Sequence, residues 1–109
     1  MAVLCSLLGK GLKGRHVLAR YVFRVHAVQR MFERGISVAE VRNVLEEGET
    51  IATYPDDKPY PSRLILGRSR QRPIHVVVAD NAPDEEIVVV TVYQPDATLW
   101  TDSFRRRRE

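Results

Sequence analysis

The sequence predicts an α+β domain: a short N-terminal strand, two helices, and a four-stranded antiparallel meander on which the helices pack. Apolar residues recur at helical spacing between residues 26 and 47, and four runs rich in β-branched residues follow, separated by turn-forming clusters. A chain of 109 residues with 44% apolar content can build one hydrophobic core but not two. We therefore expect one domain over residues 21–104, with a poorly specified extension (residues 1–20) before it and a basic tail (residues 105–109) after it.

The first two elements are a strand and a helix. Residues 21–25 are β-branched and aromatic in type, which predicts a short edge strand. Residues 26–34 predict a helix, because their apolar members fall on one arc at 100° per residue. That arc consists of Ala27, Val28, Met31 and Phe32. Gly35 is expected to end the helix as a left-handed C-cap.

The second helix has a clear start signal. Ser37 and Glu40 have the spacing of a capping box, in which each side chain bonds to the backbone of the other residue. Gly48 closes the helix. Its buried arc is expected to consist of Val38, Val41, Val44 and Leu45.

Four runs predict the strands of the meander: residues 50–54, 63–66, 73–79 and 86–93. Short links between them imply antiparallel neighbours. The last two runs are apolar on both faces, so they should be the central strands. Asp56 and Asp57 lie between prolines, where shaping a turn is the favoured role. Trp100 and Phe104 should dock the C-terminal segment.

Composition excludes several classes of protein. Cys5 is the single cysteine, so no internal disulfide forms and a cytoplasmic location is expected. The apolar start is too short for a signal peptide or a membrane span. Residues 9–14 are rich in glycine but lack the spacing of a phosphate-binding loop. The histidines and the cysteine show no paired spacing, so we expect neither a metal nor a cofactor.

The net charge of +3 hides a segregation along the chain. Residues 1–34 carry +6, residues 35–104 carry −6, and the tail of four arginines and Glu109 carries +3. A basic surface built from the two ends would attract a phosphate backbone such as RNA. A solvated tail and ion-paired faces are the alternative, and charge alone does not decide between them.

Two histidines are candidates for acid–base chemistry. His26 opens the first helix, and Arg30 lies one turn later on the same face, an arrangement that suits a general base. A neutral His26 that caps the helix is the alternative, and the favoured one. His75 lies among valines, where a hydrogen-bonded core histidine is the default; if it faced the same cleft as His26, the pair could serve as acid and base.

Two arginines and a tyrosine complete the candidate site. Arg30 and Arg63 could clamp a phosphate, and Tyr93 could stack on a base or donate a hydrogen bond. For each residue taken singly, an ordinary ion pair or a packed ring is the simpler interpretation. The complete candidate set is His26, Arg30, Arg63, His75 and Tyr93.

The pattern as a whole resembles the bacterial domain-of-unknown-function family 4258 over about residues 22–107. The resemblance is carried by His26-Ala27, Arg30-Met31, Arg34-Gly35-Ile36-Ser37, Tyr54-Pro55-Asp56-Asp57, Pro61-Ser62, Leu66-Gly67, Arg72-Pro73-Ile74-His75-Val76-Val77, Thr91-Val92-Tyr93 and Trp100. The family implies no settled activity. The element order is also similar to that of RelE-like toxin ribonucleases of type II toxin–antitoxin pairs, and this architectural likeness implies the candidate set above as the site.

Two hypotheses follow. In the first, the chain is a metal-independent endoribonuclease that pairs with an antitoxin, and its histidines and arginines converge on one point. In the second, it is a non-catalytic domain that binds a protein or nucleic acid, and the motif residues serve the fold. The second predicts carboxylate partners for the arginines and a hydrogen-bonded His75. Self-association through an edge strand is a variant of it.

Overall fold

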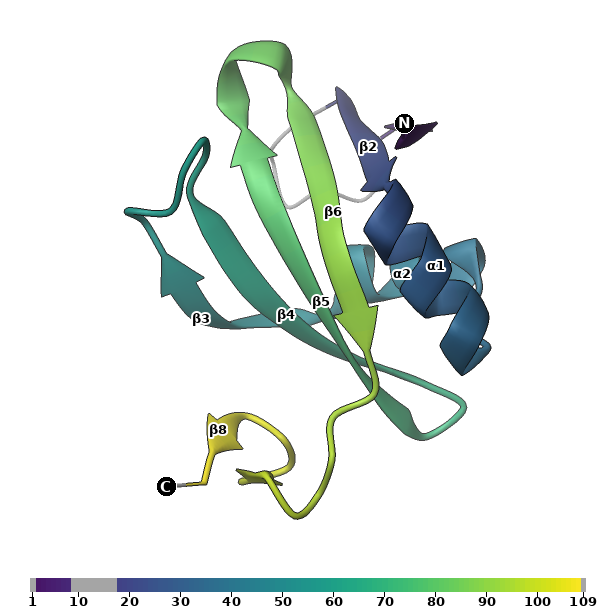
Figure 1. Ribbon diagram of the computed structural model, residues 1–109, viewed down its shortest axis with the longest axis vertical. Coiled ribbons are helices and arrows are strands. Elements are labelled where there is room, and N and C mark those ends of the chain that lie inside the picture. Colours follow the sequence, from purple (N-terminus) through teal and green to yellow (C-terminus); the bar gives the residue numbers. More distant parts are fainter. Residues whose placement is uncertain (1, 9–17, 109) are drawn as a thin grey trace.

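The computed structural model describes residues 2–8 and 18–108, which form a mixed sheet with two helices and a small C-terminal hairpin (Figure 1). The first half consists of β1 (Ala2–Leu8), β2 (Leu18–Arg24), α1 (Val25–Arg34), α2 (Val38–Glu47) and β3 (Glu49–Tyr54). The second half consists of β4 (Ser62–Ser69), β5 (Arg72–Asn81), a 3-10 turn (Ala82–Asp84), β6 (Glu86–Tyr93), β7 (Trp100–Thr101) and β8 (Arg106–Arg107). The predicted α+β class is confirmed.

The sheet is larger than the predicted four-stranded meander. Its order is β1-β2-β6-β5-β4-β3, and the meander β3-β4-β5-β6 is antiparallel as expected, with β5 and β6 at the centre. Strand β2 is not the edge strand that the sequence predicted. It pairs in parallel with β6 and adds a fifth strand to the meander. Two helices and three strands separate β2 from β6 in the chain, a connection long enough for a parallel pairing.

The predicted N-terminal extension contains β1, which pairs antiparallel with β2 along seven residues. This pairing supplies the second neighbour of β2. The apolar run at the start of the chain is therefore a strand at one edge of the sheet, and β3 is the strand at the other edge.

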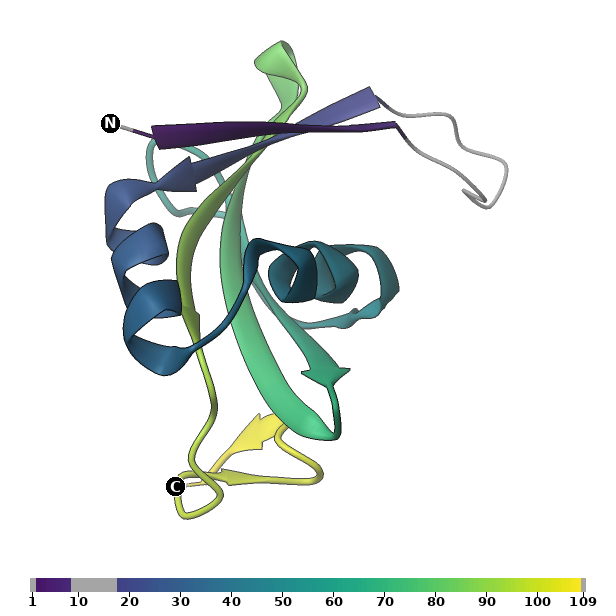
Figure 2. The ribbon, with the colours of Figure 1, turned by 90° about the vertical axis from the view of Figure 1, so that its right-hand side faces the viewer.

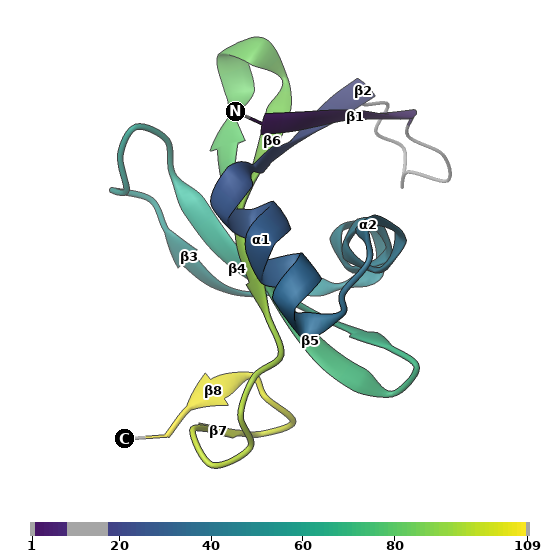
Figure 3. The ribbon, with the colours of Figure 1, turned by 45° about the vertical axis from the view of Figure 1, so that its right-hand side comes forward.

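Both helices pack on one face of the sheet, which we call the helix face. α1 lies on β6 and β2, and α2 lies on β4 and β5 (Figure 3). The caps are as predicted: Gly35 has a left-handed φ of 64°, and the capping box of Ser37 and Glu40 is fully formed. Between helices and sheet lies the main core, which includes Phe23, Val41, Val44, Ile74, Val76, Val78, Val89 and Val92.

The helices bury a narrower arc than predicted. Ala27 and Met31 are buried, but Phe32 is 88% exposed. Val38 at the start of α2 is also exposed, whereas Val41 and Val44 are fully buried. A ten-residue helix that rests on a sheet buries only the positions facing the strands, because its flanks remain open to water.

Glycine permits the close approach of α2 to β4. A Cβ on Gly67 would lie 2.7 Å from a methyl carbon of Val44. Any larger residue there would push the helix away from the sheet. The position of the second helix, and hence of its N-terminus, depends on this contact.

The C-terminal segment covers part of the opposite face of the sheet. We call residues 95–108 the clasp and the face that it covers the clasp face. β7 and β8 pair only with each other, and the clasp lies at the end of the sheet where β6 ends (Figure 2). The predicted basic tail is thus partly structured, since Arg106 and Arg107 form β8.

Candidate functional site

An aromatic cluster lies between the clasp and the sheet. Ile74 and Val76 belong to the main core, so the alternation of β5 directs His75 to the clasp face. His75 lies opposite Tyr93 in the β5–β6 pairing, with the ring centroids 5.2 Å apart. The Trp100 ring meets the His75 ring edge to face, with centroids 4.4 Å apart. The Trp100 ring therefore docks the C-terminal segment, as predicted, whereas Phe104 contributes a backbone carbonyl that bonds to His75 and a ring that lies beneath Arg68.

His75 is 0% exposed, and both of its ring nitrogens are engaged. Nε2 lies 2.9 Å from the carbonyl oxygen of Phe104, which can only accept, so Nε2 carries the proton. Nδ1 of the neutral ring then accepts from the Tyr93 hydroxyl at 3.2 Å. Burial lowers the pKa of His75, and the bond to the Phe104 carbonyl opposes this effect only in part. Burial also raises the pKa of Tyr93.

Two arginines stand over the rings of the clasp. The guanidinium carbon of Arg107 lies 6.0 Å from the centre of the Trp100 ring, and that of Arg68 lies 5.7 Å from the centre of the Phe104 ring. Neither arginine forms an ion pair with a carboxylate among residues 20–108. The site thus combines half-buried rings with guanidinium groups that keep their charge available.

The other predicted residues lie elsewhere. Arg63 is opposite Val78 on the helix face and forms a bidentate pair with Asp80, at 2.9 and 3.0 Å. The Thr50 hydroxyl accepts a further, longer bond from Arg63, at 3.4 Å. Arg63 is therefore engaged in an ion pair rather than aimed at a ligand.

His26 and Arg30 form a separate pair on α1. Nε of Arg30 donates to Nε2 of His26 at 3.5 Å, and Nη1 of Arg30 forms an ion pair with Glu33 at 3.2 Å. Helix α1 begins at Val25 with Arg24 as the N-cap, and no side chain bonds to that cap. His26 therefore does not cap the helix, contrary to the favoured interpretation of the sequence, because the helix starts one residue earlier.

The five predicted residues thus fall into three groups. His75 and Tyr93 meet on the clasp face, Arg63 lies with Asp80 on the helix face, and His26 lies with Arg30 on α1. Helix α1 covers the helix face, so the two histidines are on opposite sides of the sheet. The single hollow that the ribonuclease hypothesis requires is not formed by these side chains.

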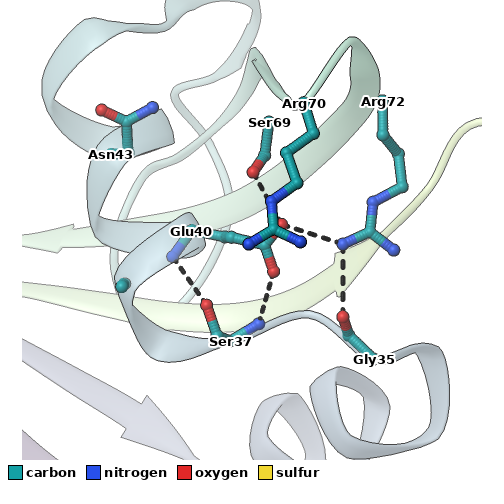
Figure 4. Close-up of a pocket in the computed structure, with 8 residues that line it drawn as sticks. Gly35, Ser37, Glu40, Asn43, Ser69, Arg70 and Arg72 are labelled. Atoms are coloured by element: carbon teal, nitrogen blue, oxygen red, sulfur yellow. Dashed lines mark hydrogen bonds and ion pairs between the residues drawn. The ribbon is translucent and has the colours of Figure 1, made fainter.

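A polar pocket of about 770 Å³, which the sequence did not predict, lies beside the N-terminus of α2 (Figure 4). Glu40 is its centre: it accepts from the Ser69 hydroxyl at 2.6 Å and from Arg72 at 3.0 Å. These bonds, with the capping bond of the Ser37 amide, hold the pKa of Glu40 down at about 2. Arg72 also donates to the carbonyls of Arg34 and Gly35, which ties the end of α1 to the β4–β5 hairpin.

The bonds around this pocket join elements of the fold. Arg70 leans over the pocket in Figure 4, and the remaining polar groups are largely bonded to one another. The capping-box spacing was the only sequence signal for it, and the partners Ser69 and Arg72 became visible only in three dimensions. We therefore interpret Glu40 and Arg72 as a structural junction.

The described residues contain neither a metal-binding cluster nor a membrane-spanning helix. No three acidic, histidine or cysteine side chains among the described residues are grouped so that they could hold a metal ion. No helix in the described part of the chain is long and apolar enough to cross a bilayer.

Comparison with known protein families places the chain in a family. The model of a protein family, a domain of unknown function (DUF4258), matches residues 23–94. This range runs from β2 to the end of β6 and includes His26, Arg30, Arg63, His75 and Tyr93. No curated protein and no solved structure matches the chain.

Proposed function

The chain belongs to the DUF4258 family, and we propose that this member is a small domain that binds single-stranded RNA on its clasp without cleaving it. The observation that carries the proposal is the pairing of Arg68 and Arg107 with the rings of Phe104 and Trp100. Arginines that track a phosphate backbone beside rings on which bases stack are the usual means of binding a single strand.

The charge of the clasp supports this proposal. Arg105 is paired with Glu49 at 2.9 Å, which anchors the turn. Arg106 and Arg107 form no ion pair with a carboxylate in the described range, and the Arg108 side chain donates to the carbonyl of Ala97. Guanidinium groups that are not already neutralised can release counterions from a nucleic acid.

Strand β3 carries a further exposed aromatic ring. Tyr54 is 43% exposed, and it lies near enough to Tyr93 to raise the pKa of that hydroxyl. Trp100 and Phe104 are half-buried and hold their positions through His75. Duplexes keep their bases stacked inside, whereas RNA commonly presents unstacked bases, so single-stranded RNA suits this surface best.

Catalysis has no support from the same geometry. A general base must reach the proton that it removes, but both nitrogens of His75 are engaged and its side chain is covered. His26 and Arg30 are on the other side of the sheet. Binding without cleavage is therefore the function that the arrangement supports best.

The test is the anisotropy of a fluorescent single-stranded RNA of about ten nucleotides, a length typical of one binding site. We expect affinity to fall steeply with salt, and Arg107→Gln to weaken binding about three- to tenfold, because one phosphate contact and one stacking partner are perturbed. Arg34→Gln removes the same charge from the exposed end of α1 and is the matched control.

Three outcomes would contradict the proposal. Equal losses in Arg107→Gln and Arg34→Gln would show that only net charge matters. Duplex RNA that binds as tightly as the single strand would remove the role of stacking. Shortened RNA after incubation, resolved on a denaturing gel and absent with His75→Gln, would favour the ribonuclease hypothesis instead.

A further inference from the structure

The clasp is attached to the sheet by side chains rather than by a backbone ladder. β7 and β8 form their own two-stranded sheet, so the clasp can leave without breaking a pairing of the main sheet. Among the described residues, its hydrogen bonds, ion pairs and ring contacts to the sheet include four: the His75–Phe104 hydrogen bond, the His75–Trp100 ring contact, the Arg105–Glu49 ion pair and the Arg68–Phe104 contact. Two of these four involve His75.

The turn of the clasp is strained. Asp102, Ser103 and Phe104 follow one another with φ values of 54°, 55° and 72°, although none of them is glycine. Side chains disfavour this left-handed region, so three consecutive residues adopt it only where other contacts impose it. The carbonyl of the third residue is the one bound by His75. Breaking this bond would allow the turn to relax.

Protonating His75 would create a cation whose hydrogen-bond partners, within the part of the chain that the structure describes, are a hydroxyl and a carbonyl rather than a carboxylate. The Tyr93 hydroxyl, which donates to the neutral ring, would have to turn and accept from it. The Trp100 ring compensates a cation less well than an acid would. Tyr93 on β6 bonds to the ring, and the other charged and titratable groups of the neighbouring strands and the clasp include Tyr54 and Glu49 on β3, Arg68 on β4, and Asp102, Arg105 and Arg107 in the clasp.

Three of these groups are arginines, and Glu49, the acid among them that lies on the sheet, is already bound to Arg105. A protonated His75 therefore gains water only if its cover moves. The cover on the clasp side is the clasp itself, because the strands beside His75 are fixed by the pairings β4–β5 and β5–β6.

We propose that protonation of His75 releases the clasp from the sheet, which makes the clasp a pH-sensitive strap. Nε2 donates to the Phe104 carbonyl in both protonation states, so this bond itself does not release the strap. What favours opening is the burial of a charged ring that has no carboxylate partner and gains hydration only when the strap leaves. The inference concerns the free protein and goes beyond RNA binding, so it can be tested with no RNA present.

The experiment uses the single tryptophan, Trp100, in the full chain. Acrylamide quenching of its fluorescence reports its accessibility between about pH 8 and pH 5. We expect the quenching constant to rise about twofold or more as the pH falls, with a midpoint below 6.5 and no change in far-ultraviolet circular dichroism.

His75→Gln is the informative variant, because a glutamine amide can donate to the Phe104 carbonyl but does not titrate in this range. It should keep Trp100 protected at every pH. His26→Gln, on the far side of the sheet, is the matched control and should titrate like the natural chain. Tyr93→Phe removes the donor to neutral His75 and should move the midpoint to higher pH, which provides a test even if His75→Gln does not fold.

Quenching that is constant with pH would overturn the proposal. A transition that persists in His75→Gln would overturn it as well, and its loss in His26→Gln would assign the transition to the other histidine. Loss of circular dichroism over the same pH range would show global unfolding rather than release of a strap, with the same consequence.

Discussion

The two faces of the sheet are covered in different ways. On the helix face, fully buried aliphatic and aromatic side chains such as Phe23, Val76 and Val89 pack against two helices. On the clasp face, a buried histidine and its aromatic neighbours lie beneath a hairpin of fourteen residues, numbered 95–108, that shares no ladder with the sheet. We therefore expect the helix face to contribute most of the free energy of folding, whereas the clasp face holds a histidine whose protonation state depends on pH.

The largest expected effect is the difference in stability lost when a buried side chain is truncated on each of the two faces. Phe23→Ala on the helix face should lower the free energy of unfolding by about 4 kcal/mol, because a fully buried ring leaves a cavity that the helices cannot fill. Leu66→Ala on the clasp face should cost about 2 kcal/mol, because the clasp can settle into the space. Urea denaturation monitored by circular dichroism measures both. Equal losses would show that the clasp is packed as rigidly as the helices.

A smaller effect concerns the junction at Glu40, where α2 meets the β4–β5 hairpin. Because the pKa of Glu40 is lowered to about 2 in the fold, its stabilising contribution is complete above 4.5 and is lost as the pH falls towards 2. Glu40→Gln should cost about 1–2 kcal/mol at pH 7 and almost nothing at the acid end, since the side chain is a charge-assisted acceptor only when ionised.

Thermal unfolding of Glu40→Gln at several pH values checks this prediction. Glu33→Gln is the matched control, because Glu33 is an exposed acid on α1. A difference between the natural chain and Glu40→Gln that does not change with pH would contradict it. On the other face, His75 should also stabilise the fold more at high pH than at low pH. Because burial lowers the pKa of His75, its contribution to the free energy of unfolding is present above pH 6.5 and declines as the pH falls through the pKa that the residue has in the folded protein.

The smallest effect is expected at Arg30, outside both faces. Its ion pair with Glu33 is exposed and one helical turn apart, so Arg30→Ala should change the free energy of unfolding by less than about 0.5 kcal/mol. RNA binding should also change little, because α1 is across the sheet from the clasp. A tenfold loss of RNA affinity in the folded variant would return Arg30 to the binding site and weaken the distinction between the faces.

Local pattern predicted much of the fold. The capping box at Ser37 and Glu40, the left-handed Gly35 and the antiparallel meander were all predicted, because each depends on neighbours within a few residues or on a short turn. The parallel pairing of β2 with β6 was not, since no local signal reports which distant strand a short apolar run will join. The exposure of Phe32 was missed because the width of a buried arc depends on the surface beneath it.

Chain order and residue type alone predicted the α+β class, the family and the candidate reactive side chains, including His75 and Tyr93. Tertiary structure decided which of these residues meet. Strand alternation sent His75 to one face while α1 carried His26 to the other, and the clasp brought the Trp100 ring and the Phe104 carbonyl against the imidazole. Such contacts join residues about 30 positions apart, and their free energy depends on burial that exists only once the sheet is complete.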